Sequence, residues 1–285
     1  MSFVVVLTAL DLEYQAVRQY LDGLQAWSHP AGTLFEVGQL PGGVGTVAMA
    51  VTGVGNVGAA VLAERAIAMF APQALICVGV AGGLRSNIAL GDVVVATKVY
   101  ALHDGRVHDD GFVARPRAWH ASHELEQVAK FVARTGTWTN SIASGPGLGP
   151  LVVQPTVHFG PVVSGEVVVS GRDESVTGRL RDVFDDAVAV EMESAGIAHA
   201  AHLNRALPVL TVRGISDHAD SAKYANDAAG WQHVAANHAA AFTVAALTKA
   251  LCHQPGVWPR TQLPVPLVSR QRQLASAFEF GAPRQ

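Results

Sequence analysis

Residues 45–70 have the sequence GTVAMAVTGVGNVGAAVLAERAIAMF, in which a glycine-rich turn joins a short apolar run to a helical pattern. Gly45–Val51 has the length and the β-branched content of a buried strand, and Asn56–Phe70 has the apolar spacing of a helix. A strand that leads into a helix is the repeating unit of α/β proteins. This stretch therefore predicts an α/β fold.

The same alternation recurs on both sides of this stretch. Further strands are predicted at Phe3–Leu7, Ala74–Val80, Asp92–Ala96, Val167–Val169, Ala187–Val190 and Val209–Val212. Further helices are predicted at Leu12–Leu21, Trp119–Thr135, Glu174–Phe184, Glu191–Leu203 and Trp231–Leu251. Alternating strands and helices predict a single domain with a mostly parallel, twisted central sheet flanked by helices.

Two stretches fall outside this alternation. Residues 137–150 are rich in Gly, Ser and Thr and are typical of a mobile loop, either a lid or a surface excursion. Four prolines, the last of them Pro266, follow Gln254, and a polar tail comes after them. We therefore expect residues 1–253 to form the domain and residues 254–285 to form an arm or a disordered tail.

Composition excludes several classes of protein. Apolar residues make up 49% of the 285 positions, but their runs are far shorter than the roughly 20 residues of a membrane helix. The net charge of −3 provides no broad basic surface for nucleic acid. The first residues lack the basic start of a secretory signal, and Cys77 lies in an apolar run that favours a buried thiol over a disulfide. We expect a cytoplasmic protein that binds neither membranes nor nucleic acid.

The turn Gly53–Gly58 matches the GxGxxG pattern of dinucleotide-binding domains. Such a domain also needs an acid at the end of the next strand, about 20 residues further on, to hold the adenosine ribose. Here that strand ends in Val80-Ala-Gly-Gly83, without an acid. The sequence therefore disfavours a nicotinamide or flavin cofactor, although the glycines still let a ligand approach the backbone closely.

Histidine pairs raise the question of a metal. His120 and His123, and likewise His199 and His202, have the i,i+3 spacing with which a helix can present two imidazoles. Neither pair has an obvious third ligand in the sequence. We therefore expect no metal and no other cofactor.

Acidic residues follow three of the predicted strands. Glu13 comes after the first strand, Glu191 and Glu193 follow the strand that ends at Val190, and Asp217 follows Val209–Val212. Each acid alone is equally well explained as a cap at a helix N-terminus. Because ligands bind at the carboxyl ends of strands in parallel sheets, the acids together favour one shared site.

Several motifs occur in a fixed order, at Leu7–Glu13, Gly53–Val57, Val78–Leu84, Gly91–Val94, Val163–Gly165, Val190–Ser194 and Arg213–Asp217. At these residues the chain resembles the nucleoside phosphorylase and nucleosidase superfamily, and more closely its 5′-methylthioadenosine/S-adenosylhomocysteine nucleosidase branch. The resemblance implies hydrolysis of the N-glycosidic bond of an adenine nucleoside that carries a 5′ substituent. It also implies a homo-oligomer, with a dimer as the first expectation.

The resemblance implies a role for each motif residue. Glu13 matches the base that activates water, and Asp217 matches the acid that protonates purine N7, with Ser216 orienting its carboxyl. Glu193 matches the acid that grips the ribose hydroxyls, and Met192 packs beneath the sugar. Together these groups neutralise a leaving purine and steady a cationic sugar, as cleavage of this bond requires.

The same resemblance places further residues at the substrate, with two departures from the family pattern. These residues are Val80, Gly82, Val168 and Val169. Val80 replaces the usual serine of the second glycine loop, and Val168 replaces the aromatic residue that stacks on adenine. Since base stacking is worth about 1–3 kcal/mol in other aromatic sites, adenine affinity is reduced or supplied by another ring.

Three alternatives stay open. Arg85 follows the second glycine loop and is the one residue that would support a phosphate site and hence phosphorolysis. The segment Ser216–Lys223, followed by Trp231-Gln232, resembles nucleosidase-like domains fused to immune-type signalling proteins, which makes a 5′-phosphorylated nucleotide a serious substrate. The departures at Val80 and Val168 are also what a nucleotide-sensing domain with little catalysis would show. A charged 5′ group would find partners in His103, Arg106 or Lys98.

Overall fold

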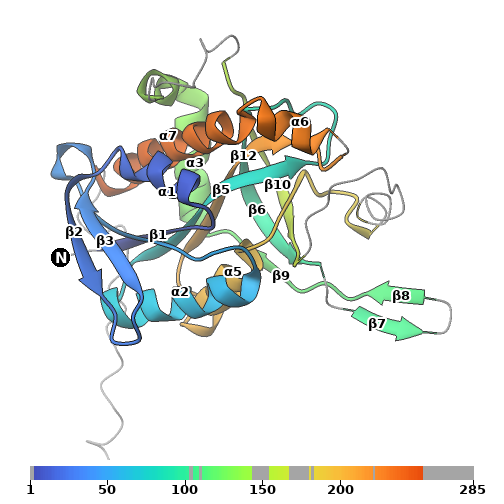
Figure 1. Cartoon of the computed structure of the whole chain (residues 1–285), viewed down its shortest axis with the longest axis horizontal. Helices are drawn as coiled ribbons and strands as arrows, with labels where there is room; N and C mark the ends of the chain where they lie inside the picture. The colour runs from blue at the N-terminus through green and yellow to red at the C-terminus, as the bar shows by residue number, and fades with distance from the viewer. Residues whose placement is uncertain are drawn as a thin grey trace, which may run out of the picture.

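The computed structural model describes residues 3–102, 105–108, 111–142, 154–166, 180, 183–220 and 222–252 (Figure 1). Its strands are β1 (Phe3–Thr8), β2 (Asp22–Ser28), β3 (Leu34–Gln39), β4 (Thr46–Val51), β5 (Ala74–Gly83), β6 (Val93–Ala101), β7 (Gly105–His108), β8 (Gly111–Ala114), β9 (Ala118–His120), β10 (Val157–Ser164), β11 (Ala189–Glu191) and β12 (Val209–Asp217). Its α-helices are α1 (Asp11–Arg18), α2 (Asn56–Phe70), α3 (His123–Thr135), α5 (Ser194–Leu203), α6 (Lys223–Ala228) and α7 (Trp231–Cys252). Two 3₁₀ turns, Pro41–Gly43 and Thr137–Ser141, complete the described elements.

The central sheet has the strand order β11-β10-β6-β12-β5-β1-β4-β3-β2, and β9 pairs with β6. Its middle, β12-β5-β1-β4, is parallel, whereas β2, β3 and β9 pair antiparallel and β6 runs antiparallel to β12. β11 also pairs antiparallel with the end of β5, so this side of the sheet curls back on itself. The predicted α/β class and helix-flanked sheet are confirmed. The sheet is mixed, with one parallel group at β12-β5-β1-β4 and a second at β11-β10-β6.

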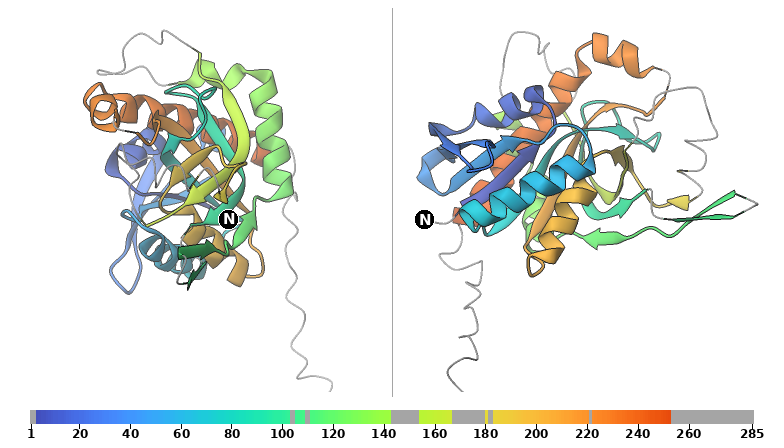
Figure 2. Two further views of the ribbon diagram at one scale, coloured as in Figure 1. Left: turned by 90° about the vertical axis from the view of Figure 1, so that its right-hand side faces the viewer. Right: turned by 60° about the horizontal axis from the view of Figure 1, so that its bottom comes forward.

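Helices cover both faces of this sheet. On one face α1 and α3 pack against α7, and on the other α2 packs against α5 (Figures 1 and 2). The buried residues of α7 are largely alanines, which let the helix approach the sheet closely. At Gly214 of β12 an added Cβ would overlap the backbone of Ala235, so this glycine is required by that close approach. β12, which ends at Asp217, is thus packed between α7 on one face of the sheet and α5 on the other.

The predicted elements match the observed ones best where burial is strong. α2 has the bounds that the sequence predicted, and β1, β4 and β5 lie where strands were predicted. β2 and β3 were not predicted, because β2 is largely exposed and lacks the alternation of a half-buried strand. β10 was also missed, since Gly160 and Pro161 at its bulge interrupt the apolar run. α3 begins four residues later than predicted, because residues 118–120 form β9.

Some predicted segments lie wholly or partly outside the described residues. The strand Val167–Val169, most of the helix Glu174–Phe184 and the tail 254–285 belong to this group, so the domain boundary at 253 stays a prediction. Of the loop 137–150, the first five residues form a 3₁₀ turn that buries Trp138 against Phe242 of α7. The short sheet β7–β8 projects away from the body of the molecule (Figures 1 and 2).

In the described part of the chain, the helices fall short of the combined length and apolar character that a bilayer crossing demands.

Candidate active site

A pocket of about 230 Å³ lies at the ends of β1, β5, β11 and β12. Seven of the ten residues that the sequence assigned to the site line it: Glu13, Val80, Gly82, Met192, Glu193, Ser216 and Asp217. β1, β5 and β12 are parallel neighbours, so their ends meet at one edge as predicted. β11 arrives differently, because its antiparallel pairing of Val190 with Gly82 turns its end toward the same edge.

Glu13 lies in the first turn of α1 and is 2% exposed. One carboxylate oxygen accepts hydrogen bonds from the N–H groups of Ala9 (2.8 Å) and Leu10 (2.9 Å), and the other accepts one from Val80 (2.7 Å). Burial raises the pKa of Glu13, and the charge of Arg213 and the three N–H donors oppose that rise. The side chain thus caps α1, as the simpler interpretation predicted, and also faces the pocket as a fixed acid that readily takes a proton.

Glu193 directly precedes α5 and is buried beside Glu13. Its carboxylate accepts a hydrogen bond from the N–H of Gly55 at 3.3 Å and is paired with Arg213 at 3.1 Å. Burial raises the pKa of Glu193 to about 7, with Glu191 and Glu13 adding to the rise and Arg213 opposing it. The glycine turn and the strand end thereby hold one acid between them at the pocket wall.

Arg213 holds these acids in place through ion pairs, a role that was not predicted from the sequence. It is 1% exposed on β12 and pairs with both Glu191 and Glu193. Glu191 also accepts hydrogen bonds from the N–H groups of Glu193 and Ser194, so it caps α5. A Cβ at Gly79 would overlap the guanidinium of Arg213 and the carboxylate of Glu13. Because a buried charge left without its partner costs about 3–5 kcal/mol, this cluster fixes the geometry of the site.

Asp217 ends β12 and is 2% exposed. One carboxylate oxygen accepts a hydrogen bond from the N–H of Ala219 at 2.8 Å. The other accepts one from the hydroxyl of Ser216 at 3.0 Å and one from the ammonium of Lys223 at 2.7 Å. Ser216 thus lies where it orients this carboxyl, as the sequence suggested, while the contact with Lys223 was not foreseen.

Two N–H groups of the glycine turn already donate to carboxylates of the protein. The N–H of Gly55 donates to Glu193, and that of Asn56, at the start of α2, donates to Glu166 at 3.0 Å. The Asn56 side chain bridges Ser164 of β10 and the N–H of Gly196 in α5. Two carboxylates therefore occupy the positions that anions take at helix N-termini. This arrangement argues against the dinucleotide alternative.

Arg85 is placed away from the pocket. Its guanidinium donates to the backbone carbonyls of Ala187 (2.7 Å) and Asp185, so it fastens the loop before β11 and does not line the site. Arg85 follows the glycine loop as expected, but its side chain extends away from this pocket, so its contact with substrate stays a prediction. Val168 and Val169, also assigned to the substrate, lie outside the described residues.

Two of the three residues considered for a charged 5′ group, Lys98 and Arg106, do not line this pocket. Lys98 pairs with Asp186 at 3.0 Å and with the hydroxyl of Tyr100, and it does not line the pocket. Arg106 lies on the projecting strand β7, and His103 is outside the described residues. Lys223, Gln232 and Val54 line the pocket without having been assigned to it.

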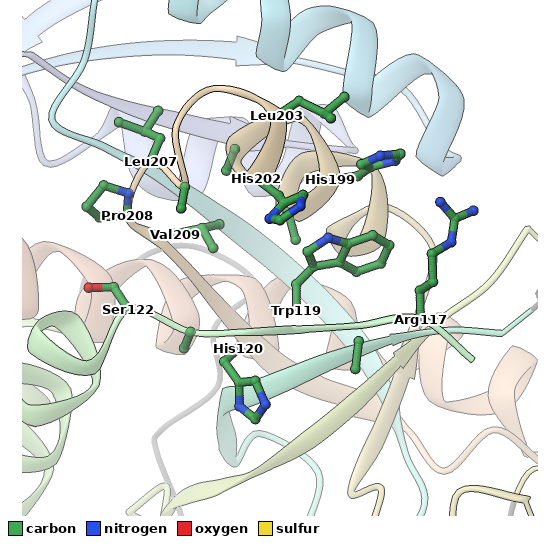
Figure 3. A pocket seen from close by; sticks show the side chains of 15 residues that line it. Arg117, Trp119, His120, Ser122, His199, His202, Leu203, Leu207, Pro208 and Val209 are labelled. Carbon is green, nitrogen blue, oxygen red and sulfur yellow. The ribbon is translucent and has the colours of Figure 1, made fainter. Parts of the chain in front are cut away.

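A second pocket, of about 650 Å³, lies between β9, the end of α5 and the start of β12 (Figure 3). His120, His199 and His202 line it, and the ring of His199 stacks on Trp119 with 5.4 Å between centroids. His120 ends β9 and His123 begins α3, so this pair lacks the helical spacing that was assumed. Among the described residues, no three His, Cys, Asp or Glu side chains are grouped as metal ligands. The catalytic candidates belong to the first pocket.

The sheet is mixed, and buried acids line a pocket at the ends of its strands, as in α/β proteins that bind small ligands there. The family model described as the phosphorylase superfamily matches residues 3–249, and the chain belongs to this superfamily. The resemblance inferred from the motifs is thereby confirmed.

Curated relatives and solved structures agree with this assignment. The chain is 27% identical to the ATP nucleosidase Cap17 of Escherichia coli, over 77% of this chain but only 46% of that protein, so it spans about half the length of this relative. It is 32% identical to a 5′-methylthioadenosine/S-adenosylhomocysteine nucleosidase of Glaesserella parasuis, over 61% of this chain and 69% of the relative. The structure of such a nucleosidase from Neisseria meningitidis, in complex with methylthio-immucillin-A, has a TM-score of 0.71 and 27% identity, covering 87% of this chain and 99% of that one.

Proposed function

We propose that this protein hydrolyses the N-glycosidic bond of an adenine nucleoside that bears a 5′ substituent and releases adenine. The observation that carries the proposal is one pocket lined by the buried acids Glu13, Glu193 and Asp217. Nucleosidases are among the relatives and structural neighbours of the chain, and they include one structure from Streptococcus pneumoniae with 8-aminoadenine bound. The names of these relatives support the reaction type, and the pocket supplies the groups it needs.

Each acid has one step in the proposed reaction. As the bond from the sugar to the purine lengthens, positive charge grows on the ribose and negative charge on the base. Glu193 holds the ribose hydroxyls and favours the positive charge, while Glu13 takes a proton from the attacking water. Asp217 passes a proton to the departing base, and Met192 packs against the sugar. Side chains of the chain perform all these steps, so we propose a reaction without cofactor or metal.

Two classes of 5′ substituent are candidates for the substrate. A methylthioadenosine-type substrate follows from the nucleosidase relatives. A 5′-phosphorylated adenine nucleotide is favoured by the ATP nucleosidase relative.

Phosphorolysis is the less favoured reaction of this site. Arg85, the residue expected to support a phosphate site, is bonded to backbone carbonyls outside the pocket. Glu13 and Glu193 would repel a phosphate anion approaching the sugar from their side. Water is therefore the favoured nucleophile.

The test is a panel of adenine nucleosides and nucleotides incubated with the protein, with and without phosphate, with free base and sugar product measured by mass. Release of adenine and a free sugar, independent of phosphate, is the expected result. Dependence on phosphate would establish phosphorolysis instead. Binding of the panel without product would overturn the enzymatic proposal in favour of a nucleotide-sensing domain.

We also propose that the chain acts in the cytoplasm, in nucleoside catabolism or purine salvage, as a homo-oligomer. Exposed apolar side chains on and before α2, namely Val54, Val57 and Val61, support a face that a second copy covers. Light scattering coupled to size-exclusion chromatography tests this assembly, and a monomeric mass at micromolar concentration would contradict it.

A further inference from the structure

Lys223, at the start of α6, contacts the acid that is proposed to act on the base. Its ammonium lies 2.7 Å from a carboxylate oxygen of Asp217, and its side chain is 19% exposed against 3% for Asp217. A second acid, Asp227, lies 3.9 Å away on the solvent side and is 27% exposed. Exposure thus rises from Asp217 through Lys223 to Asp227.

The carboxyl of Asp217 accepts three hydrogen bonds, which leaves one acceptor position on Oδ1. The N–H of Ala219 occupies one oxygen, and the hydroxyl of Ser216 and the ammonium of Lys223 occupy the other. Three donors, one of them a cation, suit an ionised carboxylate and not a carboxylic acid that holds its own proton. An acid in this state has to obtain the proton that it passes to the base. Lys223 is the contacting group with a transferable proton that also reaches toward solvent.

We infer that Lys223 supplies, through Asp217, the proton that the departing base receives; this inference rests on the proposed function. As the bond between C1′ and N9 breaks, its electron pair moves onto the purine. The proton of the Lys223 ammonium moves to Asp217, and Asp217 delivers a proton to purine N7, so adenine leaves neutral. The attacking water loses its proton to Glu13, and its oxygen forms the new bond to C1′. Lys223 regains a proton from solvent past Asp227, and Glu13 returns its proton to solvent.

The test compares leaving groups. One substrate is the adenine nucleoside or nucleotide that the panel identifies, and the other is the 4-nitrophenyl riboside with the same 5′ group, whose phenolate leaves without a proton. In Lys223→Met, kcat for release of adenine is expected to fall on the order of 10²-fold or more, the usual size of a general-acid contribution. Its kcat for the nitrophenyl riboside is expected to stay within a few-fold of the unmodified protein.

Two variants make the test specific. Lys130→Met removes a lysine that pairs with Glu126 on the surface of α3, and it should leave both substrates unaffected. Lys223→Arg keeps the cation beside Asp217 but carries a guanidinium that does not give up its proton, so it should remain slow with the adenine substrate. Circular dichroism establishes that each variant is folded. If Lys223→Met does not fold, Lys223→Arg and the uncharged, polar Lys223→Gln carry the comparison.

Each other outcome overturns the inference. Equal losses for both substrates would mean that Lys223 only shapes the pocket. A loss confined to 5′-phosphorylated substrates would mean that Lys223 binds phosphate. Full activity of Lys223→Arg would mean that charge alone is needed. If the unmodified protein releases no adenine, the proposed function itself has failed. If the unmodified protein and Lys223→Met release adenine equally fast, only the inference about Lys223 has failed.

Discussion

Replacing Glu13 by glutamine tests the proposed water-activating role most directly. The amide has nearly the same shape but cannot take a proton from water, so kcat should fall by about 10²- to 10⁴-fold. KM should change little, because the ribose and base contacts assigned to Glu193 and Asp217 remain.

The same substitution has a cost in stability that follows from the hydrogen bonds of Glu13. Its two carboxylate oxygens accept three backbone N–H groups, two on one oxygen and one on the other. A glutamine keeps one oxygen, so its best rotamer serves Ala9 and Leu10 and turns its NH₂ group toward the N–H of Val80. One buried donor then lacks an acceptor, which costs about 1–3 kcal/mol. For a domain of this size that corresponds to a fall in Tm of roughly 2–12 °C.

Steady-state kinetics and thermal unfolding of Glu13→Gln measure both effects. Glu36→Gln is the matched control, because Glu36 also accepts hydrogen bonds, from Tyr14 and Arg18, but lies outside the pocket. It should keep kcat unchanged. A Glu13→Gln protein that is folded and retains more than a tenth of the original kcat would refute the role of Glu13 as base.

Three further outcomes follow from the same site. Glu13 must be ionised to act, and burial raises its pKa. The acid side of the profile of kcat/KM against pH should therefore have an apparent pKa above 4.5, the ordinary value for a glutamate. An apparent pKa at or below 4.5 would contradict this. Gly79→Ala should unfold at markedly lower temperature, because the added Cβ overlaps Arg213 and Glu13, and an unchanged Tm would show that the cluster yields easily. Burial raises the pKa of the Cys77 thiol to about 12, so a thiol reagent should label exposed Cys252 and spare Cys77 until the chain unfolds, as mass spectrometry of the labelled protein can determine.

The location of the acids could be predicted because it depends on position along the chain alone. Glu13 and Asp217 follow strands whose apolar runs are plain in the sequence, and parallel strand ends share one edge. Glu193 was also assigned to the site, but for an incomplete reason. Its strand, β11, is parallel to β10 and joins the pocket through an antiparallel pairing with β5. No pattern of neighbouring residues in the sequence predicts such a pairing.

The direction of long side chains could not be predicted in the same way. Arg85 follows a glycine loop that borders the pocket, yet its guanidinium reaches carbonyls about 100 residues further along the chain. Glu166 is equally distant from the turn at Asn56, whose N–H it occupies. These contacts depend on which loops the fold brings side by side, whereas motif spacing describes only neighbours along the chain.

Charge balance connects the geometry of the pocket with the proposed chemistry. Among the described residues, four acids, Glu13, Glu191, Glu193 and Asp217, surround the site, and only Arg213 and Lys223 contact them as bases. Arg213 is committed to Glu191 and Glu193 in the interior, so its charge is balanced before any substrate enters. Because one guanidinium serves two carboxylates, Glu193 together with Glu13 makes the sugar side of the pocket favourable for a ribose that becomes positive. The base side instead has Lys223 behind Asp217, where negative charge develops on the purine. The pocket is therefore polarised along the bond to be broken, and reversing that polarity by placing a cation at Glu193 should abolish the reaction even in a folded protein.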